Sequence, residues 1–406
     1  MSASTILEPV APLRPADRTD LVVLGVGSIG RELLGQLSAS RGGLASGVRV
    51  CALLDRTGYV FDPAGISRRA LSALCAHKRS GRALRDAPGG LSANSTDAVA
   101  FLTACLRGRP ILVDATAADT HDILEIVLER GWDVVLANKV PLAAEQARVD
   151  RLREVGESSG ATMLHEATVG AGLPVIDTLR KLLDAGDRVT AIEGCPSGTL
   201  GFLFGQLGRG HAFSAALREA IAAGYTEPDP RVDLSGLDVA RKALILARII
   251  GYRGDLGAVS VQSLVPRALA GVSLDEFLSR SHELDDAWRA RVDAARARGA
   301  VLRYRARVTR RGVRVGLAEV SATDPLSLLH GTDNQFAFTT ARYKSQPLVI
   351  TGPGAGPAVT AAGVYNDLVR LIAEHGSRAA LPVLPDGHGH RDRRVHGQHG
   401  QGRRDL

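Results

Sequence analysis

A short stretch near the middle of the chain carries ionisable side chains that could take part together in a reaction. Glu227 and Asp233 lie in a proline-punctuated turn, and a predicted helix over residues 234–250 follows it. On that helix Asp238 and Lys242 are spaced i, i+4, which brings them to one face. Such carboxylates could bind a substrate ammonium group, with Lys242 as a general acid or base. An ordinary surface ion pair has the same spacing, so the pattern alone does not choose between the two.

A glycine-rich turn near the start of the chain predicts a dinucleotide site. Gly25, Gly27 and Gly30 form G-x-G-x-x-G directly after an apolar strand and at the start of a helix. The first glycine makes the tight turn, the second lets backbone approach a pyrophosphate, and the third allows close packing of helix on sheet. The helix N-terminus faces the negative charge. We expect the cofactor to contact the whole turn, namely Gly25, Gly27, Ser28, Ile29 and Gly30.

The next strand carries the residues that could distinguish between the two nicotinamide dinucleotides. Asp55 ends the apolar strand 48–55, where a carboxylate could accept a hydrogen bond from the ribose 2′-hydroxyl of NAD. Arg56 follows it and could instead pair with the 2′-phosphate of NADP. The sequence therefore predicts NADP or NAD and leaves the choice open.

Lys139 is a second lysine in a position suited to chemistry. It follows Asn138 at the carboxyl end of the predicted strand 132–139, where an open α/β sheet places its ligands. A nicotinamide site needs a proton donor or acceptor near the carbon that exchanges hydride. The alternative is a lysine whose apolar stem is buried while its amine reaches water at the end of the strand.

The elements that must position these residues predict an α/β fold. Continuously apolar strands alternate with helices in the first part of the chain, which is typical of a Rossmann-type, doubly wound parallel sheet. Residues 62–100 are expected to form short helices and loops. Later strands over 301–309, 313–320 and 346–351 predict a second, α+β domain. The expected divisions are a flexible leader at 1–19, the nucleotide domain at 20–160, a substrate-binding and dimerisation domain at 161–351, a C-terminal helix returning to the first domain at 352–376, and a disordered His/Arg-rich tail at 377–406.

The net charge of +7 over 406 residues raises the possibility of a nucleic-acid partner. Ten arginines and a single acidic residue lie between residues 288 and 314, so the basic character is local. The alternating segment 301–308 favours a half-buried strand that directs Arg303, Arg305 and Arg307 outward, rather than a nucleic-acid surface. We expect no nucleic-acid partner.

Targeting and cysteine patterns point to a cytoplasmic protein with a small-molecule substrate and no membrane partner. No apolar run approaches the roughly 18 residues that a membrane helix needs. The N-terminus has no basic region followed by an apolar region. Four cysteines, far apart and without a C-x-x-C pair, favour reduced thiols over a disulfide framework.

The motifs together resemble one family. The segment from Ala220 to Lys242, which contains Y-T-E-P-D-P-R-V-D-L-S-G-L-D-V-A-R-K, closely resembles the signature of homoserine dehydrogenase. Further segments are similar to the same family: DATAADT, VVLANKVPLA, HEATVGAGLP, GCPSGTLGF and the region 331–356. Pro196 departs from the family pattern, which has an apolar residue before the Ser-Gly-Thr turn. The resemblance covers about residues 20–375.

The resemblance implies NAD(P)-dependent interconversion of L-homoserine and L-aspartate 4-semialdehyde, on the route to threonine, methionine and isoleucine. It implies that Lys242 is the proton donor and that Lys139 lies between nicotinamide and substrate. Glu227 and Asp238 would bind homoserine, with Asp233 beside them. Another Rossmann oxidoreductase acting on an amino-acid-derived aldehyde, or a non-catalytic NAD(P)-binding protein, are the alternatives.

The resemblance implies further ligands and partners as well. Besides Lys139, Thr116, Gly224 and Gly356 would contact the cofactor together with the glycine turn. A monovalent cation, sodium or potassium, would be held by Glu166 and by the backbone carbonyls of Val169, Ala171 and Leu173. We expect a homodimer formed through the second domain, and a monofunctional enzyme without a kinase or ACT domain.

Overall fold

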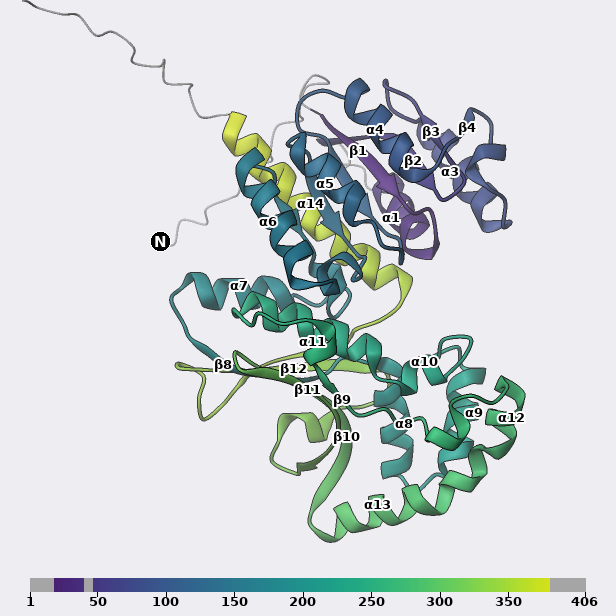
Figure 1. Cartoon of the computed structure of the whole chain (residues 1–406), viewed down its shortest axis with the longest axis vertical. Coiled ribbons are helices and arrows are strands. Elements are labelled where there is room, and N and C mark those ends of the chain that lie inside the picture. The colour runs from purple at the N-terminus through teal and green to yellow at the C-terminus, as the bar shows by residue number, and fades with distance from the viewer. Residues whose placement is uncertain (1–17, 40–46, 380–406) are drawn as a thin grey trace, which may run out of the picture.

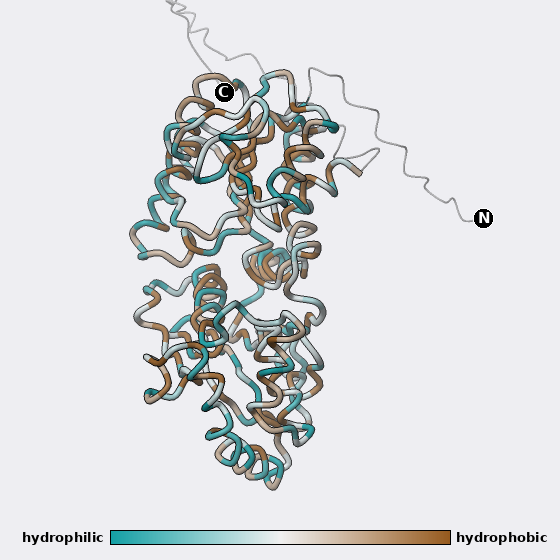
Figure 2. The backbone as a smooth tube through the Cα atoms, turned by 90° about the vertical axis from the view of Figure 1, so that its right-hand side faces the viewer, coloured by the Kyte–Doolittle hydropathy of each residue, from teal (hydrophilic) through white to brown (hydrophobic). Residues whose placement is uncertain are grey.

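The computed structural model describes residues 18–39 and 47–379, which form two lobes (Figure 1). Figure 2 shows the same lobes one above the other in a view turned by 90°. The predicted disordered tail lies almost entirely outside the described residues, as does the predicted leader up to residue 17. Among the helices of the described residues, none combines the length and the apolar character that crossing a bilayer requires.

The first lobe is built on a seven-stranded sheet of order β4-β3-β2-β1-β5-β6-β7. Its strands β1, β2, β5, β6 and β7 run parallel, as predicted, and β3 and β4 extend one edge in antiparallel fashion. The strands are β1 (Thr19–Leu24), β2 (Val48–Asp55), β3 (Gly58–Phe61), β4 (Gly90–Ser92), β5 (Ile111–Asp114), β6 (Asp133–Leu136) and β7 (Met163–Leu164). The antiparallel edge falls partly within residues 62–100, where only helices and loops were expected.

Helices cover both faces of this sheet, as the continuously apolar strands require. One face packs on α1, α3 and α14, and the other on α4, α5 and α6. Their bounds are α1 (Ser28–Ala39), α3 (Arg68–Arg79), α4 (Ser95–Cys105), α5 (His121–Glu129), α6 (Gln146–Ser159) and α14 (Pro357–Ala379). The last helix, yellow in Figure 1, returns from the second lobe and packs against α1. It extends three residues beyond the predicted end at 376.

The second lobe contains a six-stranded sheet of order β13-β12-β8-β10-β11-β9. Its strands are β8 (Val189–Cys195), β9 (Ser260–Val261), β10 (Ala300–Thr309), β11 (Gly312–Ser321), β12 (Asp333–Thr340) and β13 (Leu348–Pro353). The sequence predicted β10, β11 and β13 but not β8, β9 and β12. Strand β9 has only two residues at the edge of the sheet, whereas β8 and β12 lie inside it. Strand β12 is buried at nearly every position, so its sequence lacks the polar–apolar alternation of a one-sided strand.

Helices of the second lobe cover one face of this sheet, where α8, α11 and α13 contact β10. The helices are α7 (Val175–Asp184), α8 (Gly198–Gly208), α9 (Phe213–Ala222), α10 (Arg231–Leu234), α11 (Leu237–Ile249), α12 (Leu274–Arg280) and α13 (Asp285–Ala297). Apolar side chains of both lobes belong to one continuous core cluster. Helix α11 lies at the top of the lower lobe, directly beneath the first lobe (Figure 1).

The predicted helix over 234–250 is interrupted at its start. Gly236 adopts φ +75°, and a Cβ built there would lie 1.8 Å from the Tyr304 hydroxyl oxygen. Only glycine fits a left-handed position in such close contact. The chain therefore forms the single turn α10, reverses locally at Gly236 and begins α11 at Leu237, which puts Asp238 in the first turn of the helix.

The outward orientation predicted for the arginines of β10 is wrong for Arg303. Arg305 is half-buried and Arg307 exposed, but Arg303 is only 6% exposed. Its guanidinium donates hydrogen bonds to the carbonyls of Leu326, Ser327 and Leu329 around the short 3₁₀ helix η8 (Pro325–Leu328). The alternation of residues along β10 does not show that η8 covers this face of the strand. The carbonyls of η8 accept hydrogen bonds from the Arg303 guanidinium and so offset the cost of burying its charge.

Candidate active site

Two lysines from different lobes meet at one carboxylate. Lys242 Nζ lies 2.8 Å from Asp238 Oδ2, its i, i+4 neighbour on α11. Lys139 Nζ, after the end of β6, lies 3.4 Å from Asp238 Oδ1. Lys242 Nζ also donates a 2.8 Å hydrogen bond to the carbonyl of Pro196, which precedes α8. The structure thus brings together three residues that the sequence placed in two separate motifs, and it assigns a contact to the unusual proline.

The charges of this cluster shift its proton affinities in opposite directions. Burial and the nearby charge of Lys242 lower the pKa of Lys139, although Asp238 acts against both. Burial works against ionisation of Asp238, but Lys242 and Lys139 outweigh it and hold the pKa of this carboxyl well below its usual value. Asp238 is therefore a fixed negative charge, and Lys139 gives up its proton more easily than an exposed lysine.

The other two predicted substrate ligands lie in the turn before α10. Asp233 accepts hydrogen bonds from the backbone amide of Glu227 at 2.9 Å and from the Thr199 hydroxyl at 2.9 Å. Burial, and secondarily the charge of Asp238, raises the pKa of Asp233. The Glu227 side chain is exposed and has no hydrogen bond or ion pair within the described part of the chain. Asp233 therefore fixes the backbone of the turn and leaves the Glu227 carboxylate free for a ligand.

Thr199 was not singled out from the sequence beyond its place in the GCPSGTLGF motif. It lies in the first turn of α8, and its hydroxyl bridges Asp233 and the carbonyl of Tyr225 at 2.5 Å. Ser197 caps the same helix through the amide of Leu200. The Ser-Gly-Thr motif was a signal for a helix start, but only the fold reveals that this start contacts the turn that carries Glu227.

The glycine turn has a shape that fits a dinucleotide. A Cβ on Gly30 would lie 2.0 Å from the carbonyl oxygen of Gly25, and a Cβ on Gly25 would meet Ala115 and Thr116 at 2.9 Å. A Cβ on Gly27, in contrast, would have nothing within 4 Å. Gly25 and Gly30 are thus required by packing, whereas Gly27 borders open space at the N-terminus of α1, where Ser28 and Ile29 begin the helix. Backbone amides at such a position suit a pyrophosphate.

Asp55 is engaged by its own domain. Its carboxylate accepts hydrogen bonds from the amide and hydroxyl of Thr57, from Lys78 at 2.5 Å and from the amide of Leu84. Although burial opposes ionisation, Lys78 and Thr57 lower the pKa of Asp55. Arg56, in contrast, is exposed. The structure therefore leaves the guanidinium more available to a ligand than the carboxylate.

A buried polar network lies at the carboxyl ends of β5 and β6. Asp114 is fully buried, and it accepts hydrogen bonds from the Thr116 amide and hydroxyl, from the Thr120 hydroxyl at 2.5 Å and from Asn138 Nδ2 at 2.9 Å. Asn138 Nδ2 also lies 2.8 Å from the Ala118 carbonyl. This network fixes two of the residues predicted to contact the cofactor, Thr116 and Lys139. The sequence pointed to this end of the sheet but not to Asp114 or Asn138 as its central members.

Two further predicted cofactor contacts are glycines at helix boundaries. Gly224 follows α9 with φ +71° and leads into the turn that carries Glu227. Gly356 has φ +108°, and its carbonyl accepts a 3.0 Å hydrogen bond from the Thr360 amide in the first turn of α14. Both positions need the left-handed conformation that glycine adopts freely, so the backbone alone accounts for a glycine at each of them.

The predicted cation ligands lie in the turn before α7. The two Glu166 carboxylate oxygens accept hydrogen bonds from the amides of Ile176 and Asp177, at 2.7 Å each. Ala171 has φ +56°, and its carbonyl oxygen would lie 2.4 Å from a Cβ on Gly363 of α14. Oxygen donors of this kind suit a hard alkali cation. Within residues 18–39 and 47–379 no group of three or more His, Cys, Asp or Glu side chains is arranged for a metal.

Glu166 of this turn and Asp367 of α14 are two buried acids whose pKa values are both raised. Burial raises the pKa of Glu166 to about 7, against the two amide hydrogen bonds that lower it. Asp367 of α14 accepts a 2.8 Å hydrogen bond from the Glu166 amide, and burial raises its pKa to about 6. The returning helix α14 thus contacts the turn that joins the two lobes.

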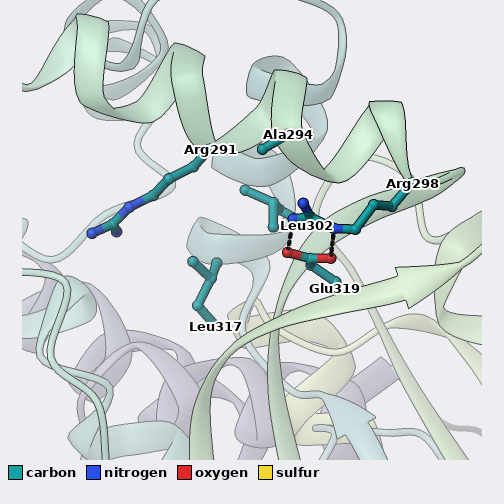
Figure 3. Close-up of a pocket in the computed structure, with 6 residues that line it drawn as sticks. All are labelled: Arg291, Ala294, Arg298, Leu302, Leu317 and Glu319. Carbon is teal, nitrogen blue, oxygen red and sulfur yellow. Dashed lines mark hydrogen bonds and ion pairs between the residues drawn. The ribbon is translucent and has the colours of Figure 1, made fainter.

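A separate pocket of about 480 Å³ lies far from these residues in the second lobe, beneath α13 (Figure 3). Arg298 and Glu319, two of its lining residues, neutralise each other through hydrogen bonds of 2.8 and 2.5 Å. Leu302 and Leu317 form apolar parts of its wall. Arg298 and Glu319 are exposed and already paired, and the exposed Arg291 lies over the ring of Trp288. The pocket therefore offers no buried ionisable group for the chemistry that the lysines suggest.

Comparisons with known proteins give one consistent result. Residues 174–369 match the family model described as homoserine dehydrogenase, and residues 25–166 match the model of the homoserine dehydrogenase NAD-binding domain. A homoserine dehydrogenase of Paracoccidioides brasiliensis is 38% identical over 368 residues, which cover 87% of this chain and 97% of that protein.

Longer relatives and a solved structure are also similar. A bifunctional aspartokinase/homoserine dehydrogenase of Zea mays is 44% identical over 272 residues, which cover 66% of this chain. The chain spans only 30% of the length of that bifunctional relative. The crystal structure of a Candida auris protein of unknown function superposes with a TM-score of 0.78 at 33% identity, covering 88% of this chain and 98% of that one.

Proposed function

Because the chain belongs to the homoserine dehydrogenase family, we propose that it catalyses the NAD(P)-dependent interconversion of L-homoserine and L-aspartate 4-semialdehyde. This reaction lies on the route to threonine, methionine and isoleucine. The observation that carries the proposal is the placement of the Asp238 carboxylate between Lys139 and Lys242. Two amines held at one fixed negative charge can stabilise and protonate an alkoxide.

The turn from Gly25 to Gly30 would hold the cofactor, with Thr116, Lys139, Gly224 and Gly356 as further contacts. The bound dinucleotide would supply a hydride to the aldehyde carbon. The occupied carboxylate of Asp55 and the exposed guanidinium of Arg56 favour NADP over NAD, since a 2′-phosphate pairs with an arginine.

Lys242 would donate the proton that the developing alkoxide needs. Asp238 and the Pro196 carbonyl hold its Nζ from two sides, which fixes its direction toward the substrate. The positive charge of Lys139 would stabilise the same oxygen from the opposite lobe. In the oxidation direction Lys242 would take the proton back from the homoserine hydroxyl.

The acidic turn would orient the other end of the substrate. Glu227 and Asp238 would bind the substrate ammonium group, and Asp233 would hold the Glu227 backbone in place. Orientation rather than covalent chemistry then carries the step.

The proposal includes a monovalent cation, sodium or potassium, at Glu166 and the carbonyls of Val169, Ala171 and Leu173. This ion would stabilise the conformation of the turn between the lobes. It also includes a homodimer formed through the second lobe, measurable by light scattering, and a location in the cytoplasm. The four cysteines are all unpaired, which supports a reducing compartment.

The decisive experiment follows NADPH and NADH oxidation with aspartate 4-semialdehyde in wild type and Lys242→Ala. We expect turnover in the wild type, faster with NADPH, and a loss of about 10²–10⁴-fold in kcat in the variant. Lys181→Ala is a matched control, because Lys181 forms an i, i+4 pair with Asp177 on α7. No turnover in the wild type, or a kcat of Lys242→Ala equal to that of Lys181→Ala, would contradict the proposal.

A further inference from the structure

Helix α11, which carries Asp238 and Lys242, contacts the first lobe near both of its ends. Near its start, Asp238 pairs with Lys139 at 3.4 Å. Near its end, Arg248 reaches the segment that directly follows Lys139. The two contacts are separated by ten residues, or about 15 Å of helix. A helix held at two such points cannot rotate or slide against the first lobe without breaking one of them.

Arg248 makes its contacts almost entirely with backbone carbonyls. Its Nη1 donates to the Leu142 carbonyl at 2.6 Å, and its Nη2 donates to the Ala144 carbonyl at 2.8 Å. These carbonyls belong to the 3₁₀ turn η3 (Pro141–Ala143) and the residue after it. Nη2 also donates to the Gly254 carbonyl at 3.0 Å, in the loop after α11. One guanidinium therefore joins both lobes.

The same turn is tied rigidly to Lys139. The Ala143 amide donates to the Lys139 carbonyl at 3.0 Å, and the Val140 amide donates to Asn138 Oδ1 at 3.0 Å. Asn138 belongs to the buried network of Asp114. A displacement of the turn relative to Arg248 would therefore be passed directly to Lys139 and to its distance from Asp238.

The burial of Arg248 argues against a role in stability alone. Its side chain is only 2% exposed, and its carboxylate neighbour Asp255 lies 3.5 Å away. Burial lowers its pKa, and its Nε has no hydrogen-bond partner. A buried charge of this kind stabilises a fold no better than an apolar residue of similar volume. Arg248 instead fixes the relative position of the groups that it binds, because a planar guanidinium donates its hydrogen bonds in fixed directions.

We propose that Arg248 is a positioning residue for the reaction: it holds α11 against the turn after Lys139, so that Asp238 can bridge Lys139 and Lys242. The inference rests on the proposed function, since it concerns the alignment of the two lysines used there. Asp255 supports the arrangement from the second lobe, because its Oδ1 also accepts a 2.6 Å hydrogen bond from the Gln146 amide at the start of α6.

The test compares Arg248→Met, which keeps the length of the side chain without its donors, with Arg248→Lys, which keeps the charge. We expect a 10- to 100-fold lower kcat for Arg248→Met, the effect of a misplacement of about 1 Å in an active site. Arg248→Lys should lie between this variant and the wild type. The KM for NADPH should stay within twofold, because the Gly25–Gly30 turn is not touched.

Arg253→Met is the matched control. Arg253 follows α11 and pairs with Asp150 of α6, so it too bridges the lobes, but its side chain is 68% exposed. Exposed pairs of this kind contribute little, so kcat should stay within twofold of wild type.

The pH profile separates positioning from plain structural support. Asp238 raises the pKa of Lys139, whereas burial, Lys242 and Arg241 lower it. A looser Lys139–Asp238 contact in Arg248→Met should therefore move the basic limb of kcat/KM to lower pH, and Arg253→Met should not. Thermal unfolding is measured alongside, because a purely structural residue would lower the melting temperature and leave this limb unchanged below it.

Each outcome has a clear meaning. An inactive wild type overturns the proposed function itself. An active wild type together with an Arg248→Met variant of normal kcat and normal pH profile overturns the positioning role. If Arg248→Met does not fold, Arg248→Lys decides the matter: a normal kcat and profile in this variant contradict the proposal, and a reduced kcat with an unchanged KM for NADPH supports it.

Discussion

In the first lobe, both oxygens of Asp114 accept hydrogen bonds from donors of the same domain. Across the junction, the exposed carboxylate of Glu227 has no partner in the described part of the chain. Asp114 and Asn138 are 0% and 2% exposed, and they fix the ends of two buried strands. The backbone of Glu227 is held by the hydrogen bond that its amide donates to Asp233 Oδ2. One side of the site is thus complete before any ligand binds, and the other is left for the substrate to complete.

This difference follows from what each side has to bind. A hydride transfer tolerates little error in the distance between two carbons, so the groups around the nicotinamide need a rigid support. A substrate ammonium group needs at least one carboxylate that no protein group already occupies, and Glu227 would supply it beside Asp238, which the two lysines hold. Lys139 and Asp238 are the contact between the two sides.

The largest effect is expected from Asp114→Ala, which breaks the rigid side. The hydroxyls of Thr116 and Thr120, the Thr116 amide and the Asn138 amide would lose their common acceptor. Unsatisfied buried donors cost about 1–3 kcal/mol each, and Asn138 Nδ2 keeps the Ala118 carbonyl as an acceptor. With three donors left unsatisfied, we expect the free energy of unfolding to fall by at least about 3 kcal/mol, with a weaker affinity for NADPH. Denaturant unfolding and cofactor titration measure both. An unchanged stability would mean that the network is not fixed by Asp114.

A smaller and more selective effect is expected from Glu227→Gln, which alters the open side. Loss of one charge-assisted hydrogen bond to the substrate ammonium group, worth about 1.5–3 kcal/mol, should raise the KM for aspartate 4-semialdehyde about tenfold or more. The free energy of unfolding should not change, because the side chain has no partner among residues 18–39 and 47–379. Glu157→Gln, at an exposed position of α6, should change neither quantity. A loss of stability in Glu227→Gln would contradict the distinction between the two sides.

The smallest of the three expected effects is a shift in the pH dependence of kcat/KM in Asp238→Asn. Asp238 lies at the contact between the rigid side and the open side of the site. Asp238 is the group that raises the pKa of Lys139, so its neutralisation lowers that pKa further and favours the uncharged amine. The basic limb of kcat/KM should move to lower pH, in addition to the lower rate. Asp286→Asn serves as the control, since Asp286 is 95% exposed and paired only with Arg289 on the same helix. A basic limb that moves to higher pH would reverse the assigned electrostatics.

Several parts of the site were visible in the sequence for reasons that are local. The spacing of Gly25, Gly27 and Gly30 follows the turn between strand and helix, in which Gly30 packs on the Gly25 carbonyl. Asp238 and Lys242 meet because a helix repeats every 3.6 residues. The parallel strands β1, β2, β5 and β6 could be predicted because each is a continuously apolar run.

Other parts were not visible because they depend on distant segments. Arg303 belongs to an alternating strand, and only the turn at 325–328 covers it. Strand β12 is buried at nearly every position, which removes the alternation that marks a strand at the surface of a sheet. Strand β8 alternates only in part, because Thr190 is exposed but Gly194 and Cys195 are both buried at its end. No local pattern singles out Arg248 at the end of α11, because its acceptors in the first lobe, the Leu142 and Ala144 carbonyls, lie more than one hundred residues earlier.

The sequence by itself determined the class of fold, the cofactor turn and the two lysines that carry the proposed chemistry, because each of these depends on spacing along a single element. Only the tertiary structure decided that one carboxylate stands between the lysines, that Asp55 is occupied and Glu227 is free, and that a buried arginine joins the lobes. These facts depend on the distance between segments far apart in the chain. That distance is fixed by packing, which no local pattern of residues encodes.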